Sequence, residues 1–232
     1  MSAVAIIPAR GGSKRIPRKN IKHFNGKPMI AWTIERAVAS NLFDEVIVST
    51  DDAEIASIAK TFGASIDELR NPNLSNDNAT LVEVMNSEAI KLIESNFDPL
   101  DSLCCLYPVS PLLNYEFVYK GLQVIKQRQV DFVISVKEFE QSPMRAFVIE
   151  NDGFLNYKFP QYSNIRTQDL ERLYTDAGQF TIATMKTWSN SKEGLNGLIY
   201  PIVLDKFDAI DIDEMNDWEF VEEIFEIRNK KK

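Results

Sequence analysis

The stretch that decides the fold lies at the start of the chain, where AVAII at residues 3–7 leads into PARGGSKRIPRKN at residues 8–20. A continuous apolar run of this length, ended by a proline, is typical of a parallel strand buried on both faces. The segment that follows carries five cationic side chains and no acidic one. Because open parallel sheets bind ligands beyond the carboxyl ends of their strands, this cationic segment lies where a ligand would bind.

Beyond this segment the chain alternates between helical and strand-like patterns. Apolar residues recur at helical spacing in the segments 28–38, 52–62, 81–93 and 114–129. Between these segments lie short apolar runs typical of strands, at 46–49, 103–107 and 132–136. The resulting order predicts an α/β fold with a doubly wound, mostly parallel sheet and right-handed crossovers.

The alternation stops at residues 138–176, which we interpret as an excursion from the sheet that serves as a dimer arm or a lid. A hairpin is predicted inside it, with strands at 145–149 and 154–159 around the turn Asn151-Asp152-Gly153. The α/β pattern then returns, with predicted strands at 178–184, 200–204 and 209–212 and a helix over 214–228. One domain with an inserted hairpin or arm accounts for all 232 residues.

Composition limits the kinds of function that the chain can have. The net charge of −8 disfavours a general nucleic-acid binder. The first apolar run precedes its positive charges, which is the reverse of a secretory signal, and no run approaches the ~18 apolar residues of a membrane span. We therefore expect a cytoplasmic protein without a membrane partner. One histidine and two adjacent cysteines exclude a Cys-rich zinc site and any site with two or more histidine ligands, so we expect any metal to be a hard cation held by oxygen.

Cations nevertheless gather at the start of this acidic chain, where the first 34 residues hold seven basic residues and no acidic one. Gly11 and Gly12 let backbone N–H groups approach an anion closely, and Ser13 adds a hydroxyl donor. The nearest positive charges come from Arg10, Lys14, Arg15 and Lys19. This combination suits a triphosphate, whose charge needs many donors, although neither a Walker A loop nor a dinucleotide loop is present. The alternative is a solvated basic surface turn.

A second motif, Asp211-Ile212-Asp213, ends the apolar run at residues 209–210. Alternate positions of a strand share a face, so we expect the two carboxylates to lie together. Two such carboxylates can hold one Mg²⁺ ion, with water and phosphate oxygens as its other ligands. The alternative is that Asp213 only caps the last helix and Asp211 is solvated.

Five segments together resemble the CMP-sialic acid synthetase (acylneuraminate cytidylyltransferase) family. They are IIPARGGSKRIPRKNI at 6–21, FDEVIVSTDDAEIA at 43–56, LR…SNDNAT at 69–80, LYPVSPLL at 106–113 and AIDID at 209–213. Tyr107, where the sialic branch usually has Gln, and the stretch RTQDLERLYTDAGQF at 166–180 are most similar to the pseudaminic acid branch of the family.

This resemblance implies a single Rossmann-like nucleotidyltransferase domain over residues 1–232. It implies a reaction in which CTP and a nine-carbon 2-keto sugar acid give a CMP-sugar and pyrophosphate, with Mg²⁺ as cofactor. The anomeric hydroxyl of the sugar attacks the α-phosphorus in line. It further implies a homodimer formed through an arm like the excursion at 138–176.

The resemblance also implies roles for individual residues. It implies that Arg10, Lys19 and Asp211 take part in catalysis and that Asp211 and Asp213 bind the metal. The positions implied to contact the nucleotide are Arg10, Gly11, Gly12, Ser13, Lys14, Lys19, Asn20, Arg70, Ser75, Asp77 and Thr80, with Arg70 and Ser75 near the cytosine. The positions implied to lie near the sugar are Tyr107, Arg166, Gln168, Asp176 and Gln179. For Tyr107 and Gln179, packing within the strands is an equal alternative.

Three other interpretations remain open. Within the wider group, the acid could be a sialic, legionaminic or Kdo acid. A GT-A-type glycosyltransferase also combines a nucleotide fold with Asp-x-Asp, but it would carry that motif in mid-chain and release a nucleoside diphosphate. A non-enzymatic nucleotide-sensing module is disfavoured because the cationic segment and both aspartates are present.

Overall fold

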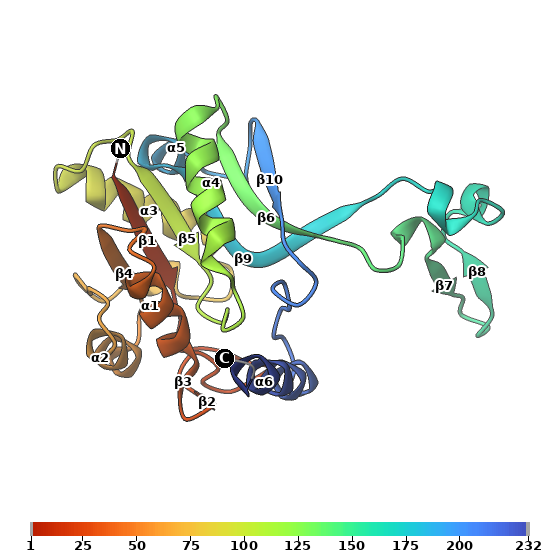
Figure 1. Cartoon of the computed structure of the whole chain (residues 1–232), viewed down its shortest axis with the longest axis horizontal. Helices are drawn as coiled ribbons and strands as arrows, with labels where there is room; N and C mark the ends of the chain where they lie inside the picture. The colour runs from red at the N-terminus through yellow and green to blue at the C-terminus, as the bar shows by residue number, and fades with distance from the viewer. Residues whose placement is uncertain (1, 231–232) are drawn as a thin grey trace.

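The computed structural model describes residues 2–230, which form a six-stranded sheet with helices on both faces (Figure 1). From edge to edge the strands are β10 (Ile199–Val203), β6 (Phe132–Glu138), β9 (Tyr174–Thr184), β5 (Ser102–Leu106), β1 (Ala3–Pro8) and β4 (Glu45–Ser49). Strand β9 is antiparallel to both of its neighbours, whereas the other paired strands of this six-stranded sheet are parallel. The predicted mostly parallel α/β sheet is confirmed.

Strand β1 is buried on both sides, which explains why AVAII is apolar at every position. Ala5 and Ile7 belong to the hydrophobic cluster on one face, and Val4 and Ile6 to the cluster on the other. The first face is covered by α1 (Met29–Ala39), α2 (Ala53–Thr61) and α4 (Tyr115–Gln127), and the second by α3 (Leu81–Glu94) and α5 (Met185–Asn190). Among residues 2–230, no helix has the length and apolarity that crossing a membrane requires.

The direction in which the sheet is wound changes beside β1. The chain passes from β1 to β4 on one side, and from β4 to β5 on the opposite side of β1. Ligands of open α/β sheets bind at such a switch point, in the crevice outside the carboxyl ends of the strands. The cationic segment leaves β1 at this point, and Tyr107 follows β5 at the same edge.

A long arm projects away from the sheet between β6 and β9 (Figure 1). Since β6 ends at Glu138 and β9 begins at Tyr174, the arm comprises residues 139–173. The arm carries the antiparallel hairpin β7 (Phe147–Ile149) and β8 (Leu155–Tyr157), so the predicted hairpin is confirmed. Its apolar side chains are largely exposed, and apolar patches of this kind mark interaction surfaces.

Two local predictions are corrected by the structure. Residues 209–212 form no strand, because their backbone is held by lysine side chains: Lys137 donates to the carbonyl of Ala209 and Lys19 to that of Ile212. Their apolar pattern reflects a buried connection rather than a strand. Strand β9 begins at Tyr174 rather than at residue 178, because its first three residues pair with the end of β6.

The last helix, α6 (Met215–Lys230), packs against the N-terminal part of the chain. Phe24, from the short hairpin β2 (His23–Phe24) and β3 (Lys27–Pro28), meets Trp218 and Phe225 with ring centroids 5.5 and 5.2 Å apart. The edge-on arrangement of these rings is the favoured geometry for aromatic pairs. Packing of α6 therefore brings the connection before it, with Asp211 and Asp213, beside the cationic segment.

Candidate functional site

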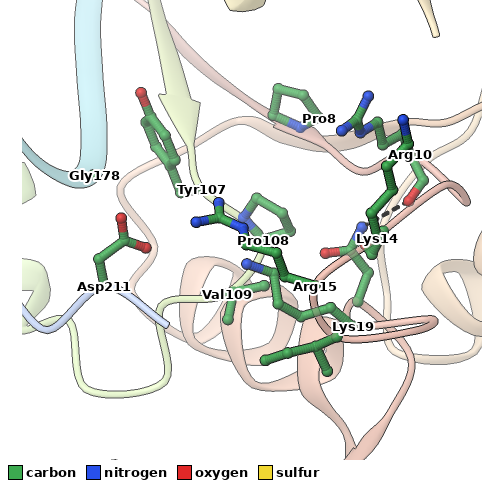
Figure 2. Close-up of a pocket in the computed structure, with 13 residues that line it drawn as sticks. Pro8, Arg10, Lys14, Arg15, Lys19, Tyr107, Pro108, Val109, Gly178 and Asp211 are labelled. Atoms are coloured by element: carbon green, nitrogen blue, oxygen red, sulfur yellow. Dashed lines mark hydrogen bonds between the residues drawn. The ribbon is translucent and has the colours of Figure 1, made fainter. Parts of the chain in front are cut away.

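A cavity of about 430 Å³, which we call the first cavity, lies at the carboxyl ends of β1 and β5. Figure 2 shows Arg10 and Lys14 on one side of it and Tyr107 and Asp211 on the other, with Arg15 projecting between them. Its remaining lining comes from Pro8, Ser13, Ile16, Lys19, Asn20, Pro108, Val109 and Gly178. Cations and a carboxylate therefore face one another across a space large enough for a small polyanion.

Hydrogen bonds to the neighbouring strand end shape the cationic segment. The backbone N–H of Gly11 donates to Asp51 Oδ1 at 3.1 Å, and the buried Asn20 donates from Nδ2 to the carbonyl of Arg10 at 2.9 Å. Further along, Arg18 adopts a left-handed backbone and pairs with Asp52, the N-cap of α2. The segment is therefore closed onto itself and anchored to the start of α2.

The two glycines of the segment have different surroundings. A Cβ on Gly11 would lie 2.6 Å from Asp52 Oδ2, and that carboxylate is held in place as a helix cap. A Cβ on Gly12 would meet no heavy atom within 4 Å. Only glycine thus fits at position 11 without a shift of Asp52, whereas the space at position 12 is open.

Arg10 and Lys14 are held by one carboxylate from a distant loop. Asp77 Oδ1 lies 3.1 Å from Arg10 Nη1, and Asp77 Oδ2 lies 2.6 Å from Lys14 Nζ. The hydrogen bond from Lys14 and the charges of both cations lower the pKa of Asp77. Because the groups are largely exposed, these ion pairs contribute little to folding. Asp77 is thus paired with both cations, and its carboxylate has no hydrogen-bond donor to offer to a bound anion.

The cationic segment also contacts the C-terminal aspartates. Arg15 Nη2 lies 2.6 Å from Asp213 Oδ1, and Lys19 Nζ lies 3.9 Å from the same oxygen. Lys19 Nζ donates to the carbonyl of Ile212 at 2.6 Å. Burial lowers the pKa of Lys19, and the charges of Asp213 and Asp211 oppose that shift. Residues almost two hundred positions apart therefore form one ionic cluster.

Asp211 and Asp213 differ in their partners. Within residues 2–230, no lysine or arginine nitrogen lies within 4.0 Å of the Asp211 carboxylate, whereas Asp213 pairs with Arg15. Desolvation by the surrounding protein and the charge of Asp213 raise the pKa of Asp211, although Lys19 and Lys137 oppose this. An uncompensated carboxylate beside a second one is a site that a cation would stabilise. The described residues bring no third acidic, histidine or cysteine side chain to it, so further ligands would have to come from water or from a phosphate.

Arg70 and Ser75 line a separate small cavity of about 390 Å³ together with Asp51. The buried Arg70 donates from Nε to Ser75 Oγ at 3.0 Å and from Nη1 to the carbonyl of Ser49 at 3.1 Å. Burial lowers the pKa of Arg70, and the charges of Asp51 and Glu88 oppose that shift. The guanidinium is therefore fixed by its neighbours, with its position set before any ligand enters.

The residues expected near a sugar lie in different parts of the structure: in the first cavity, in β9 and on the arm. Tyr107 lines the first cavity, and its backbone N–H donates to the carbonyl of Gln179 at 3.0 Å. Gln179 itself is buried and donates to the carbonyl of Ala177, while Asp176 accepts from the N–H of Gly178. Arg166 and Gln168 lie on the arm, and neither lines the first cavity.

Three further residues of the site were not predicted from the sequence. Asp51 accepts from Gly11, Glu88 accepts from Ser49 beside Arg70, and Lys137 donates to the backbone ahead of Asp211. Asp51 could have been found, because it lies two residues after the end of β4, the strand next to β1. Thr80, expected to contact the nucleotide, forms the capping box of α3 with Glu83.

A cationic cavity at the switch point of a doubly wound sheet, opposite a pair of carboxylates, defines the class: a nucleotide-binding α/β enzyme of the nucleotidyltransferase type. The family model described as cytidylyltransferase matches residues 4–158. The chain therefore belongs to the cytidylyltransferase family.

The names of proteins that are similar to the chain over its whole length are consistent with this family. It is 38% identical over 231 residues to the pseudaminic acid cytidylyltransferase of Campylobacter jejuni subsp. jejuni, which covers 99% of both chains. It is 32% identical over 237 residues to the CMP-N,N'-diacetyllegionaminic acid synthase of Legionella pneumophila, again over 99% of both. Its fold is that of CMP:2-keto-3-deoxy-manno-octonic acid synthetase, solved with CTP, at a TM-score of 0.71 and 17% identity, covering 98% of this chain and 100% of that one.

The contrast between the two glycines predicts a difference in stability. Gly11→Ala should lower the free energy of unfolding of the ligand-free protein by about 1–3 kcal/mol, because the new Cβ pushes Asp52 off the start of α2. Gly12→Ala should change it little and serves as the matched control. Chemical denaturation of both variants measures the difference, and equal unfolding midpoints would contradict the contact between Gly11 and Asp52.

Proposed function

We propose that the protein transfers CMP from CTP to the anomeric hydroxyl of a nine-carbon 2-keto sugar acid, with pseudaminic acid favoured, and releases pyrophosphate. The observation that carries the proposal is the cationic cavity that faces Asp211. The family supports CTP as the donor, and the names of the relatives support a sugar acid of this kind as the acceptor. A reaction that consumes CTP also supports a cytoplasmic location.

The side chains of the first cavity suit nucleotidyl transfer. In this chemistry the sugar oxygen forms a bond to the α-phosphorus as the bond from that phosphorus to the pyrophosphate oxygen breaks. Catalysis depends on position and on neutralised charge, which lysine and arginine supply without a covalent intermediate. We assign Arg10, Lys14 and Ser13 to the β- and γ-phosphates. Lys19, with Arg10, is assigned to the charge that builds on the α-phosphate.

Asp211 and Asp213 fit a divalent metal ion, which we propose to be Mg²⁺. Mg²⁺ usually binds through one or two carboxylates and completes its shell with water and substrate phosphate, and the pair supplies that number of carboxylates. When bound, such an ion polarises a phosphate oxygen and lowers the pKa of a nearby hydroxyl. The ion pair from Arg15 holds Asp213 beside the cavity until then.

We assign the cytosine to the small cavity around Arg70. Cytosine presents two acceptors, O2 and N3, and the Nη2 group of Arg70, which donates to no other described residue, can serve them. The preset guanidinium reduces the conformational cost of base binding, because Ser49 and Ser75 already orient it. Asn20 lines the first cavity, where its hydrogen bond to the carbonyl of Arg10 holds it, and we assign it to the ribose side of the nucleotide.

We further propose that the protein is a homodimer formed through the arm. Ile149 and Phe154 at the tip of the hairpin are each 72% exposed, which is costly for an arm that meets only water. Arg166 and Gln168 lie on the same arm, and neither lines the first cavity of their own chain. Exchange of arms within a symmetric dimer would cover the apolar hairpin and carry these two side chains to the partner's sugar pocket.

Product analysis tests the reaction. With CTP and Mg²⁺, pseudaminic, sialic, legionaminic and Kdo acids are offered separately, and mass spectrometry identifies the products. We expect a CMP-sugar with equimolar pyrophosphate, at the highest kcat/KM for pseudaminic acid. A preference for another of the four acids would change the acceptor and keep the class. Release of a nucleoside diphosphate, or no product with any acid, would contradict the proposed function.

Removal of single charges tests the assignments within the first cavity. Asp211→Asn and Lys19→Met should each lower kcat by roughly 10²–10³, as is usual when one stabilising group of a transition state is lost. Chelation of divalent ions with EDTA should abolish turnover. Asp67→Asn and Lys60→Met, at exposed side chains that line neither the first cavity nor the cavity around Arg70, are the matched controls. Unchanged turnover in Lys19→Met, or an unchanged Mg²⁺ dependence in Asp211→Asn, would remove that residue from the mechanism.

Mixing of variants tests the exchange of arms. Asp211→Asn and Arg166→Ala are each expected to be nearly inactive as pure proteins. After subunit exchange, each mixed dimer holds one intact site, so the mixture should recover about a quarter of the wild-type activity. Unlabelled and tagged subunits, recovered together, measure the exchange itself. A mixture that exchanges subunits and gains no activity would place Arg166 outside the partner's site.

A further inference from the structure

Asp211 also lines another cavity, which we call the second cavity and which is distinct from the small cavity around Arg70. None of the residues assigned to the nucleotide lines it. Its volume is about 830 Å³, and Asp211 lines both cavities. The ends of β6 and β10 and the side of α6 enclose it, with Lys137, Val203 and Phe220 among its lining. An acceptor in this second cavity would meet the nucleotide at Asp211, where the two cavities adjoin.

Lys137 is the feature of this cavity that points to a ligand. It lies near the end of β6, and its half-buried side chain donates from Nζ to the carbonyl of Ala209 at 3.0 Å. Throughout residues 2–230, no carboxylate oxygen lies within 4.0 Å of this Nζ, whereas the nearby Lys206 lies 2.8 Å from Glu140 Oε1. An ammonium group carries three donors, so Lys137 has donors left for a ligand.

Three of the five acidic side chains that line the second cavity have other partners, whereas no lysine or arginine nitrogen of the described residues lies within 4.0 Å of the Asp205 or Asp211 carboxylate. Glu138 lies 3.8 Å from Arg172, and Glu140 pairs with Lys206. Asp217 accepts hydrogen bonds from two backbone N–H groups before α6, at 2.9 and 2.8 Å. A ligand that enters the cavity therefore meets Lys137, a cation that no carboxylate oxygen of the described residues approaches within 4.0 Å, together with the unpaired Asp205 and Asp211. That cation lies close enough to Asp211 to oppose the rise in its pKa.

We propose that Lys137 binds the carboxylate of the sugar acid and so selects an acid as the acceptor. This inference rests on the proposed function. In the ring form of a 2-keto sugar acid, the anomeric carbon carries both the carboxylate and the hydroxyl that attacks. A carboxylate held at Lys137 Nζ therefore leaves the neighbouring hydroxyl directed at Asp211 and the first cavity. The charge-assisted hydrogen bond favours an acid over a neutral sugar of the same shape.

A purely structural role for Lys137 would have different consequences. Its hydrogen bond to Ala209 holds the backbone two residues ahead of Asp211. If this were its whole role, loss of the side chain would displace Asp211 and impair the use of CTP and metal as much as the use of the acid. Separate Michaelis constants for the two substrates therefore distinguish the two roles.

The test compares three variants in steady-state turnover. Lys137→Met should raise the KM for the sugar acid roughly 10- to 100-fold, the range expected for one hydrogen bond to a charged group, and leave the KM for CTP near the wild-type value. Lys137→Arg should recover most of the loss. Lys206→Met is the matched control, because that lysine is already paired with Glu140. The wild type should also prefer the acid over its primary amide, and Lys137→Met should lose that preference.

Two results would overturn the inference alone while wild-type turnover is normal. One is an unchanged KM for the acid in Lys137→Met, and the other is an equal rise in the KM for CTP with the preference for acid over amide retained. Wild-type protein that uses none of the four acids would overturn the proposed function, and this inference with it.

Discussion

The accumulation of positive charge after β1 is the constraint on which the rest of the structure depends. Cations packed around a small cavity repel one another, so the ligand-free protein must supply anions from elsewhere. It does so from three separate regions: Asp52 pairs with Arg18, Asp77 with Arg10 and Lys14, and Asp213 with Arg15. These three aspartates come from different connections around the switch point. The sheet topology is therefore also the means by which the charges are balanced.

The pairs differ in how readily a ligand can replace them. Asp52 is a helix cap and stays in place, because its loss would expose the first N–H groups of α2. Asp77 and Asp213 pair through exposed side chains, and such pairs are weak in water. A polyphosphate, with more charge and more acceptors than a carboxylate, can take over Arg10 and Lys14 at small cost. The fixed pair thus shapes the segment, and the replaceable pairs keep its cations oriented.

The sequence was sufficient to predict what local pattern determines. AVAII predicted the buried strand, and the alternation that follows predicted the α/β sheet with its arm, because each depends on the spacing of apolar residues. The region before α6 was predicted wrongly as a strand, since a buried connection and a short strand have the same apolar pattern. The role of Lys137 could not be predicted, because it depends on which carbonyl and which carboxylates lie nearby in space.

The position of Asp211 shows how packing far from the cavity enters the chemistry. Asp211 lies in a connection without regular structure, so its own residues do not fix it. The connection is held instead at both sides by lysines, through Ala209 and Ile212, and at its end by α6. The aromatic contacts of α6 with Phe24 join that end to the hairpin that directly follows the cationic segment. Because the hairpin and the segment are continuous, the packing of α6 against Phe24 contributes to the position of the carboxylates relative to the cations.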